Sequence, residues 1–553
     1  MTNRRDFIKK IGKSSASFIF ANAIIDSLVM AQVSSILDIP PSDYYYLGIS
    51  IPGGPARWMF DLPLYKNESE KTKMIKNPMV FTEFSENATG IDSASGNIPN
   101  PNGTIKTEYK LHDINGTLLP PLWNSKFTFN NQENHLDDLA KNCIFMRGMH
   151  SLPFHAGYYK AYQPQINIPS ISAISGLQSA DFPIQGIQWA NQAVKFNHPL
   201  GLTPISFSGL PSSKNKVEEY LRKIFAPFIV DQKNSEILLN TKIKNALDIL
   251  KKAGKLKNKN SHTLHNIADR ARRIMGSKIE NLINDMSAAY ENYLQVNSLS
   301  MKSLVKNLDD KPIFNPAKSP QYDPSKNVFN TDYPDIPLNN FFNGFNDHNF
   351  DMRNYTLIDD NSAKSFTASC YDLCFSLSIA EVLLKNKITN SLLLPAGTLR
   401  GLLNGRYSAR FRNDTHNIGA IPTAFFNTKY FQAIAHSLNH FIQQIGPNLF
   451  DKTIIHLASE FSRSPRIDAT GSDHGNTACQ ATIISGMVKS TKIVGDIDFE
   501  MTKDIRPNYN GTWGQNANGK SYKEVYAMVE EMCDIEKDKR VYKSPPLKKT
   551  DLV

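Results

Sequence analysis

The sequence has little of three things: long apolar runs, cysteine, and an excess of one charge. After residue 40, no apolar run approaches the roughly 20 residues that a membrane-spanning helix needs. Five cysteines in 553 residues are sparse, and a chain of this length can bury a large core without a disulfide framework. Cys370 and Cys374 are four residues apart in a helical pattern, so we expect them to share a buried face as core residues and not as ligands.

The charge balance argues against nucleic acid as a partner. The formal net charge is +10, and residues 1–31 account for +3 of it, since five basic residues there face two aspartates. The remaining +7 is spread over about 520 residues without an arginine-rich arm or an aromatic–basic stripe. We therefore expect solvated surface charge; weak attraction to a small anionic substrate, such as a phosphorylated molecule, is the other interpretation.

The N-terminal residues resemble an export signal. Arg4 and Arg5, followed by Asp6-Phe7-Ile8-Lys9, resemble a twin-arginine signal, and a moderately apolar stretch at residues 15–30 ends in a small-residue cleavage site at Ala31. Residues 1–31 are therefore predicted to be a signal peptide recognised by the twin-arginine translocase. The mature protein would then be periplasmic or secreted, folded before transport, and without a stable membrane anchor after cleavage. The alternative is a basic amphipathic helix of a cytosolic protein.

The rest of the chain alternates short apolar runs with amphipathic helices. This pattern predicts an α/β fold, with a mostly parallel sheet flanked by helices on both faces. Strands are predicted at residues 44–51, 143–149, 391–394, 453–458 and 481–485, and helices at residues 370–384 and 431–445.

Composition divides the chain into four segments. Residues 1–31 are the signal, and residues 32–213 form an N-terminal half of the core in which residues 66–140 and 164–212 look like polar, turn-rich loops. Residues 214–308 are basic and helical, which predicts a helical insert or cap. Residues 309–553 form the C-terminal half, which carries the Asp/His motifs described next.

Two Asp/His pairs stand in loops of this pattern. Asp414 and His416 form the first, Asp473 and His474 the second, and between them Glu460-Phe461-Ser462-Arg463 directly follows the strand at residues 453–458. Open α/β sheets build their sites at such positions. Carboxylate plus neutral imidazole is a ligand set for divalent ions such as zinc or manganese, so the pairs predict a metal site.

These motifs resemble a known family. Asp473-His474-Gly475-Asn476 is similar to a metal motif of cofactor-independent phosphoglycerate mutases. The order Asp-Thr-His, Glu-Phe-x-Arg-x-Pro and Asp-His resembles the exported family named domain of unknown function 1501, grouped with the alkaline phosphatase-like superfamily. The resemblance spans most of the chain and is dense over its final 190 residues or so.

The resemblance implies an alkaline phosphatase-like fold with two metal ions, one held by Asp414 and His416 and the other by Asp473 and His474 with an N-terminal aspartate. That aspartate is expected at residue 59, where this chain has Met59. Asp61, two positions later, is the nearest carboxylate and takes its place as the predicted ligand.

Three further residues are candidates for catalysis. Ser151 follows the strand at residues 143–149 and is the candidate nucleophile, with His155 as a leaving-group acid or metal ligand. The alternative is that Ser151 caps a helix and His155 bonds to backbone. Arg463 is a candidate clamp for an anion, or it pairs with a neighbouring carboxylate.

The sequence thus predicts an exported metal-dependent hydrolase of phosphate or sulfate esters. The competing hypothesis is a non-catalytic exported binding or envelope protein with a degenerate metal site, which Met59 favours. A redox enzyme has weak support, since the sequence has no cysteine cluster of iron–sulfur spacing and no Gly-x-Gly-x-x-Gly after the first strand.

Overall fold

The computed structural model describes residues 44–67, 111–151, 155–177, 278–302, 370–398, 420–465, 479–497 and 521–553, with short stretches between them. The predicted signal peptide, residues 1–31, lies outside the described residues.

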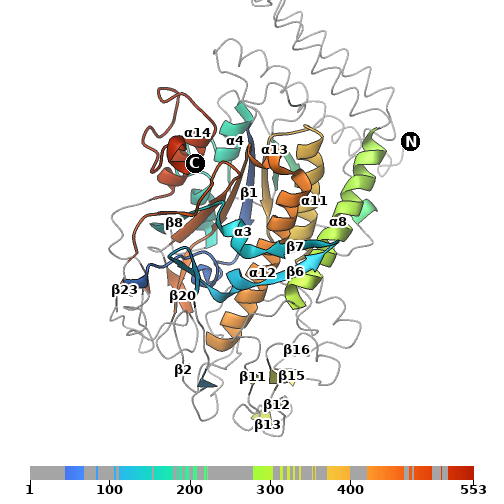
Figure 1. The fold of residues 1–553 in the computed structure, drawn as a ribbon, viewed down its shortest axis with the longest axis vertical. Coiled ribbons are helices and arrows are strands. Elements are labelled where there is room, and N and C mark those ends of the chain that lie inside the picture. Colours follow the sequence, from blue (N-terminus) through green and yellow to red (C-terminus); the bar gives the residue numbers. More distant parts are fainter. Residues whose placement is uncertain are drawn as a thin grey trace, which may run out of the picture.

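An eight-stranded sheet runs through the described part of the chain (Figure 1). From one edge to the other its strands are β10 (Ile205–Phe207), β9 (Ile187–Trp189), β17 (Ser391–Pro395), β1 (Tyr45–Ile51), β18 (Thr453–Ser459), β21 (Cys479–Ile484), β8 (Cys143–Met149) and β22 (Lys492–Val494). Neighbouring strands are parallel except at β21, which is antiparallel to both β18 and β8. Counted along the chain, the order is 4-3-5-1-6-7-2-8, with only the seventh strand reversed.

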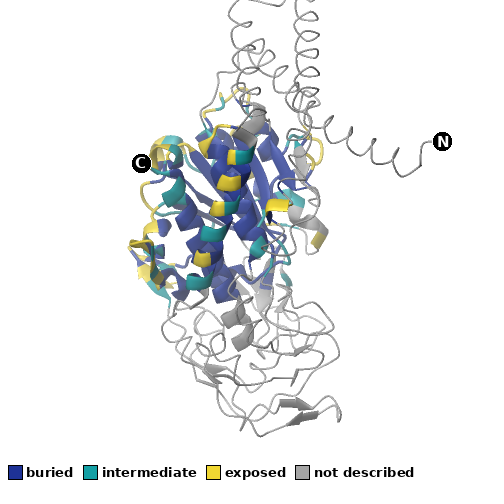
Figure 2. Cartoon of the chain, turned by 90° about the vertical axis from the view of Figure 1, so that its right-hand side faces the viewer, coloured by how far each residue is buried: buried dark blue, intermediate teal, exposed yellow. Residues whose placement is uncertain are grey.

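The central strands are buried on both faces. All seven residues of β1, β8 and β18 are buried, as expected for near-continuous apolar runs covered by helices on each side. The helices α8 (Lys278–Lys302), α11 (Tyr371–Lys385) and α12 (Ala420–Ile445) share one apolar cluster with β1 side chains such as Leu47. On the opposite face, Tyr46 belongs to a second cluster with α4 (Ile171–Leu177), α14 (Tyr522–Met532) and the 3₁₀ segment η4 (His155–Ala161). Figure 2 shows the buried core between these layers.

Local signals set the helix ends. α12 stops at Ile445 because Gly446 takes a positive φ of 75° and Pro447 then opens the short helix α13 (Pro447–Phe450). α14 begins with a capping box, in which Ser521 and Glu524 satisfy each other's backbone N–H groups. Among the described helices, none is long and apolar enough to cross a membrane.

Short elements complete the described fold. Four further segments are η1 (Arg57–Met59), η3 (Pro121–Asn124), α3 (Leu136–Ala140) and η6 (Lys549–Leu552). Antiparallel pairs join β2 (Glu83–Phe84) to β3 (Ile105–Lys106), β4 (His112–Ile114) to β5 (Thr117–Leu119), β6 (Lys126–Phe129) to β7 (Gln132–His135), β11 (Pro312–Phe314) to β14 (Ile336–Pro337), β12 (Gln321–Asp323) to β13 (Val328–Asn330), β15 (Asp351–Met352) to β16 (Tyr355–Thr356), β19 (Ser462–Pro465) to β20 (Ser472–Gly475), and β23 (Phe499–Glu500) to β24 (Thr512–Trp513).

The structure confirms the α/β class and the five predicted strands, each within about two residues of its predicted bounds. It corrects two expectations. Residues 66–140 are not simply surface loops, because Leu119, Leu122 and Trp123 are buried in the main cluster. Residues 164–212 contain β9 and β10, which extend the sheet at one edge.

The predicted helical insert is described only in part. Its helix α8 packs against α11 and α12 and so belongs to the helical layer of the core. Most of residues 214–277 lie outside the described residues.

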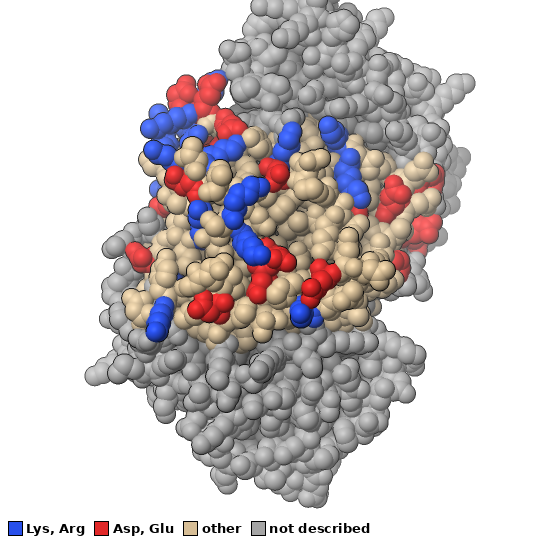
Figure 3. Space-filling model, viewed as in Figure 1, with Lys and Arg blue, Asp and Glu red and all other residues tan. Residues whose placement is uncertain are grey.

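The other composition-based predictions agree with the structure. All five cysteines are buried and free, as the helical spacing of Cys370 and Cys374 indicates. On the face drawn in Figure 3, acidic and basic side chains of the described residues are interspersed, which fits solvated surface charge.

Candidate functional site

The sheet brings the predicted site segments to one edge. β1, β17, β18 and β8 all point the same way, so their carboxyl ends share an edge, and the reversed strand β21 starts there. The segments after β1, β8 and β18, and the hairpin β19–β20 before β21, therefore meet at this edge. That is where open α/β sheets carry their sites.

The segment after β1 is bound to the segment after β18. Arg463 donates from Nε to the carbonyl of Gly54 at 2.7 Å and from Nη2 to that of Gly53 at 3.2 Å. Gly53 and Gly54 have positive φ values of 83° and 54°. A Cβ on Gly54 would lie 2.1 Å from the ring of Phe461, so glycine is needed there for both conformation and space. Arg463 is buried, and its guanidinium holds the loop. This geometry indicates a positioning role for Arg463 and not the exposed anion clamp that the sequence predicts.

A histidine–carboxylate pair lies at the same edge. His155 Nδ1 is 2.6 Å from Oε2 of Glu460, and the ring of His155 is half exposed while Glu460 is nearly buried. A carboxylate accepts hydrogen bonds, so we assign the Nδ1 proton to the imidazole.

Ser151 is fixed by the same residue, because its hydroxyl donates to the backbone carbonyl of Glu460 at 3.1 Å. Glu460 thus orients both candidates on the segment after β8.

His474 completes this cluster of rings. In the hairpin β19–β20, His474 is opposite Arg463, and the imidazole lies 4.0 Å from the ring of Phe461 and 5.0 Å from that of His155 between centroids. His155 and Phe461 are themselves 5.2 Å apart. Two imidazoles and one carboxylate, from the segment after β8 and from the segments on either side of the turn between β18 and β21, therefore gather around Phe461.

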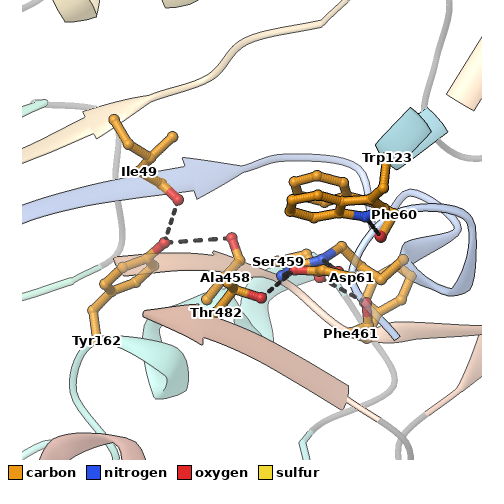
Figure 4. A network of polar contacts seen from close by, with 10 residues as sticks. Ile49, Phe60, Asp61, Trp123, Tyr162, Ala458, Ser459, Phe461 and Thr482 are labelled. Atoms are coloured by element: carbon orange, nitrogen blue, oxygen red, sulfur yellow. Dashed lines mark hydrogen bonds and ion pairs between the residues drawn. The ribbon is translucent and has the colours of Figure 1, made fainter. Parts of the chain in front are cut away.

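The carboxylate of Asp61 contacts Arg57 and Thr482. Its carboxylate forms a bidentate ion pair with Arg57, four residues earlier, and accepts a hydrogen bond of 2.6 Å from Thr482 (Figure 4). Arg57 and Asp61 are both buried. Burial alone would lower the pKa of Arg57, but the Asp61 carboxylate raises it above its usual value, so the guanidinium stays charged. Thr482 is in β21, opposite Leu457, which is two residues before the end of β18. Asp61 is bound here as an ion-pair partner.

Buried tyrosine side chains connect the strands that carry the site segments, and three buried histidines lie in the core. Tyr162 donates to the carbonyls of Ile49 at 2.7 Å and Ala458 at 3.3 Å, which ties the ends of β1 and β18 together (Figure 4). Tyr46 bonds Nδ1 of His456 at 2.9 Å, and burial lowers the pKa of His456 to about 3. His436 and His440 are likewise buried, with pKa values lowered by burial to about 3 and about 4. All three are neutral core histidines, as their place in helix or strand interiors predicts.

The predicted metal ligands are described only in part. Asp414 and His416 lie outside the described residues, and for Asp473 only the backbone, in β20, is described. Within the part of the chain that the structure describes, no three His, Cys, Asp or Glu side chains are grouped so as to hold a metal ion. The donor set nonetheless fits a divalent ion in kind, because it consists of carboxylate and imidazole groups.

Sequence reasoning missed the role of Glu460. Its position directly after a buried strand was the available signal, but Glu460 and His155 are 305 residues apart, and nothing local links them. Phe461, around which the cluster packs, gave no chemical signal.

Comparison with known proteins gives no name for this fold. No family model, curated protein or solved structure matches the chain.

Proposed function

We propose that this protein is an exported, metal-dependent hydrolase of phosphate or sulfate esters, with a fold of the alkaline phosphatase-like kind. The mostly parallel sheet with helices on both faces is compatible with this proposal, and the Asp/His motifs supply the resemblance to that superfamily. The observation that carries the proposal is the His155–Glu460 pair beside His474, at the sheet edge where such folds place their chemistry.

His155 supplies the proton transfer. Glu460 accepts from Nδ1, which holds the ring in one orientation and stabilises its protonated form, so Nε2 can protonate the leaving oxygen of an ester. The bond from that oxygen to phosphorus or sulfur breaks with its electron pair on the oxygen. The Ser151 oxygen takes the place of the leaving oxygen on phosphorus or sulfur, and its hydroxyl proton passes to solvent. Water then displaces the serine oxygen, which takes a proton back from solvent, and a proton released from that water restores the imidazolium.

The ester's negative charge requires a counter-charge. Two divalent ions such as zinc or manganese, one held by Asp414 and His416 and the other by Asp473 and His474, would supply it. Ser151 is the candidate nucleophile; its hydroxyl now donates to the Glu460 carbonyl and has to leave that bond before attacking.

The second candidate is a non-catalytic exported binding protein. Two observations favour it: Asp61 is held by Arg57, and Arg463 is held by backbone carbonyls, so two of the charged residues in the motifs serve the scaffold. Metal content and ester hydrolysis together separate the two candidates.

The first experiment is elemental analysis of the protein purified without chelator, followed by assays on p-nitrophenyl phosphate and p-nitrophenyl sulfate. The variant Asp473→Ala/His474→Ala should lose both bound metal and turnover. His112→Ala is the matched control, because His112 also pairs with a carboxylate, Asp137 at 2.8 Å, but that carboxylate is on α3 at the opposite, amino end of β8. Stoichiometric metal without turnover of any ester would favour the binding protein, and absence of metal from the unaltered protein would refute metal dependence.

The role of His155 has its own test. His155→Gln should slow hydrolysis of an alkyl phosphate by about 100-fold or more, within the range of general acid catalysis, but that of p-nitrophenyl phosphate much less, since p-nitrophenolate leaves without a proton. A merely structural histidine would slow both substrates equally. Glu460→Gln keeps an acceptor oxygen and should lie between the unaltered protein and Glu460→Ala.

Export is tested by substitutions in the predicted signal peptide. Arg4→Lys/Arg5→Lys should leave the protein in the cytoplasm, whereas Lys9→Arg should not. Equal periplasmic yield of both variants would refute export through the twin-arginine translocase.

A further inference from the structure

A distant segment closes over the amino end of the central strand. Tyr44, the residue before β1, donates from its hydroxyl to Oδ2 of Asp534 at 2.6 Å. Lys549 donates from Nζ to the same carboxylate oxygen at 2.6 Å and to the Tyr44 hydroxyl at 2.5 Å. The Lys549 ammonium also lies 4.2 Å from the centre of the Tyr44 ring. One cation, one anion and one aromatic ring therefore hold three parts of the chain at a single point.

The segment that carries Asp534 and Lys549 is itself anchored to α14. Buried Glu530 accepts from the backbone N–H groups of Val541 at 2.7 Å and Tyr542 at 3.0 Å. Glu531 pairs with Arg540 and accepts from the backbone N–H of Lys549 at 3.0 Å.

The far end of the segment is fixed as well. Leu552 is buried, and its carbonyl accepts from the backbone N–H of Lys489 at 2.8 Å. Residues 533–552, which we call the latch, are thus bound along their length to the second core cluster, and Lys549 is held in position against Tyr44.

The point that the latch covers controls the centre of the sheet. β1 lies between β17 and β18, and its first backbone bonds run from Tyr45 to the carbonyl of Lys452 and from Tyr46 to that of Asn390. These bonds come directly after Tyr44. Asp534 and Lys549 are 490 and 505 residues further along the chain, so contacts of very long sequence separation hold the residue that precedes these bonds.

We propose that residues 533–552 act as a latch that holds the amino end of β1 in the sheet, and that export of the folded chain depends on this latch being closed. The second half rests on the proposed export, since the predicted twin-arginine address is joined to the fold through Tyr44. An open latch leaves the start of β1 unpaired beside the address, in a chain that has to be folded before transport.

Hydrogen exchange tests the latch without reference to export. In Asp534→Asn/Lys549→Met, exchange at the amides of Tyr45 and Tyr46 should become about tenfold faster, whereas the amides of β8 should be unchanged. Lys539→Met is the matched control, because Lys539 also forms an ion pair within the latch, with Glu536 at 2.9 Å, but does not touch Tyr44. Unchanged exchange at Tyr45 and Tyr46, or equal acceleration in β8, would overturn the latch.

Export is then measured on the chain with residues 1–31 present. The Asp534→Asn/Lys549→Met variant should give several-fold less periplasmic protein than Lys539→Met, while its cytoplasmic pool keeps native protection in β8. Equal export of the two variants overturns the dependence of export on the latch and leaves the address intact. If even the unaltered chain stays in the cytoplasm, the proposed export and its dependence on the latch fall together, and the exchange experiment still decides the latch.

Discussion

The Arg57–Asp61 pair offers a direct test of how the charged residues after β1 are used. Both side chains are buried and bidentately paired, and Thr482 adds a third contact to the carboxylate. Asp61→Asn removes the negative charge but keeps the shape, which leaves the guanidinium buried and uncompensated. Breaking one partner of a buried ion pair costs about 3–5 kcal/mol, so we expect Asp61→Asn to lower the free energy of unfolding by that amount.

A double-mutant cycle isolates the pairing. Arg57→Met/Asp61→Asn leaves no buried charge, so it should be less destabilised than Asp61→Asn alone, as urea denaturation followed by tryptophan fluorescence would show. Asp451→Asn breaks the exposed pair with Lys489 and should cost less than about 1 kcal/mol. If Asp61→Asn is as mild as Asp451→Asn but strips the protein of bound metal, Asp61 is a ligand and the ion-pair reasoning is wrong.

Three further predictions concern stability. Gly54→Ala should cost about 2–4 kcal/mol, because its Cβ meets the Phe461 ring and φ is positive, whereas Gly116→Ala, also at positive φ but in open space, should cost only about 1 kcal/mol in urea denaturation; equal costs would contradict the contact. Burial lowers the pKa values of the core histidines His436, His440 and His456 below 6.5, so the unfolded chain binds more protons than the folded chain. The free energy of unfolding should therefore fall on acidification below pH 6.5, by about 2 kcal/mol per histidine at pH 5. A urea midpoint that is flat between pH 7 and 5 would refute this. Burial raises the pKa of Glu530 to about 7, although two backbone hydrogen bonds lower it. The contribution of the protonated side chain to the free energy of unfolding is therefore lost as pH rises from about 4.5 to 7. Glu530→Gln should remove a pH dependence of up to about 3 kcal/mol, and Glu536→Gln should not.

The parts of the fold that the sequence predicts are those that one segment determines alone. β1, β8 and β18 are seven-residue apolar runs bounded by turn residues, and the structure has them within a residue of prediction. β9 and β10 are three residues each, too short for a periodic pattern, and become strands because β17 offers β9 a free side. Trp123 reads as part of a polar stretch, yet it packs between Phe60 and Phe145 because the folded chain brings those rings to it.

The same distinction separates the two kinds of charged residue in the motifs. Asp61 follows Arg57 at a spacing of four, so a local signal for its ion pair was present in the sequence and competed with the ligand that the resemblance implies. The partner of His155, in contrast, comes from the far side of the sheet and is found only once β8 and β18 are placed in register with β21.

The charged residues of the motifs can therefore be separated by whether their side chains form hydrogen bonds that the backbone of the fold requires. In the turn at Gly53 and Gly54, two backbone carbonyls have no strand to pair with, and the buried guanidinium of Arg463 donates a hydrogen bond to each. The motif therefore needs an arginine there whether or not the protein is an enzyme. His155, in contrast, pairs with the Glu460 carboxylate, and half of its ring faces solvent. A half-exposed imidazole paired with a nearly buried carboxylate is the arrangement that supports the proposed roles of His155 and Glu460, whereas Arg463 is engaged by the scaffold.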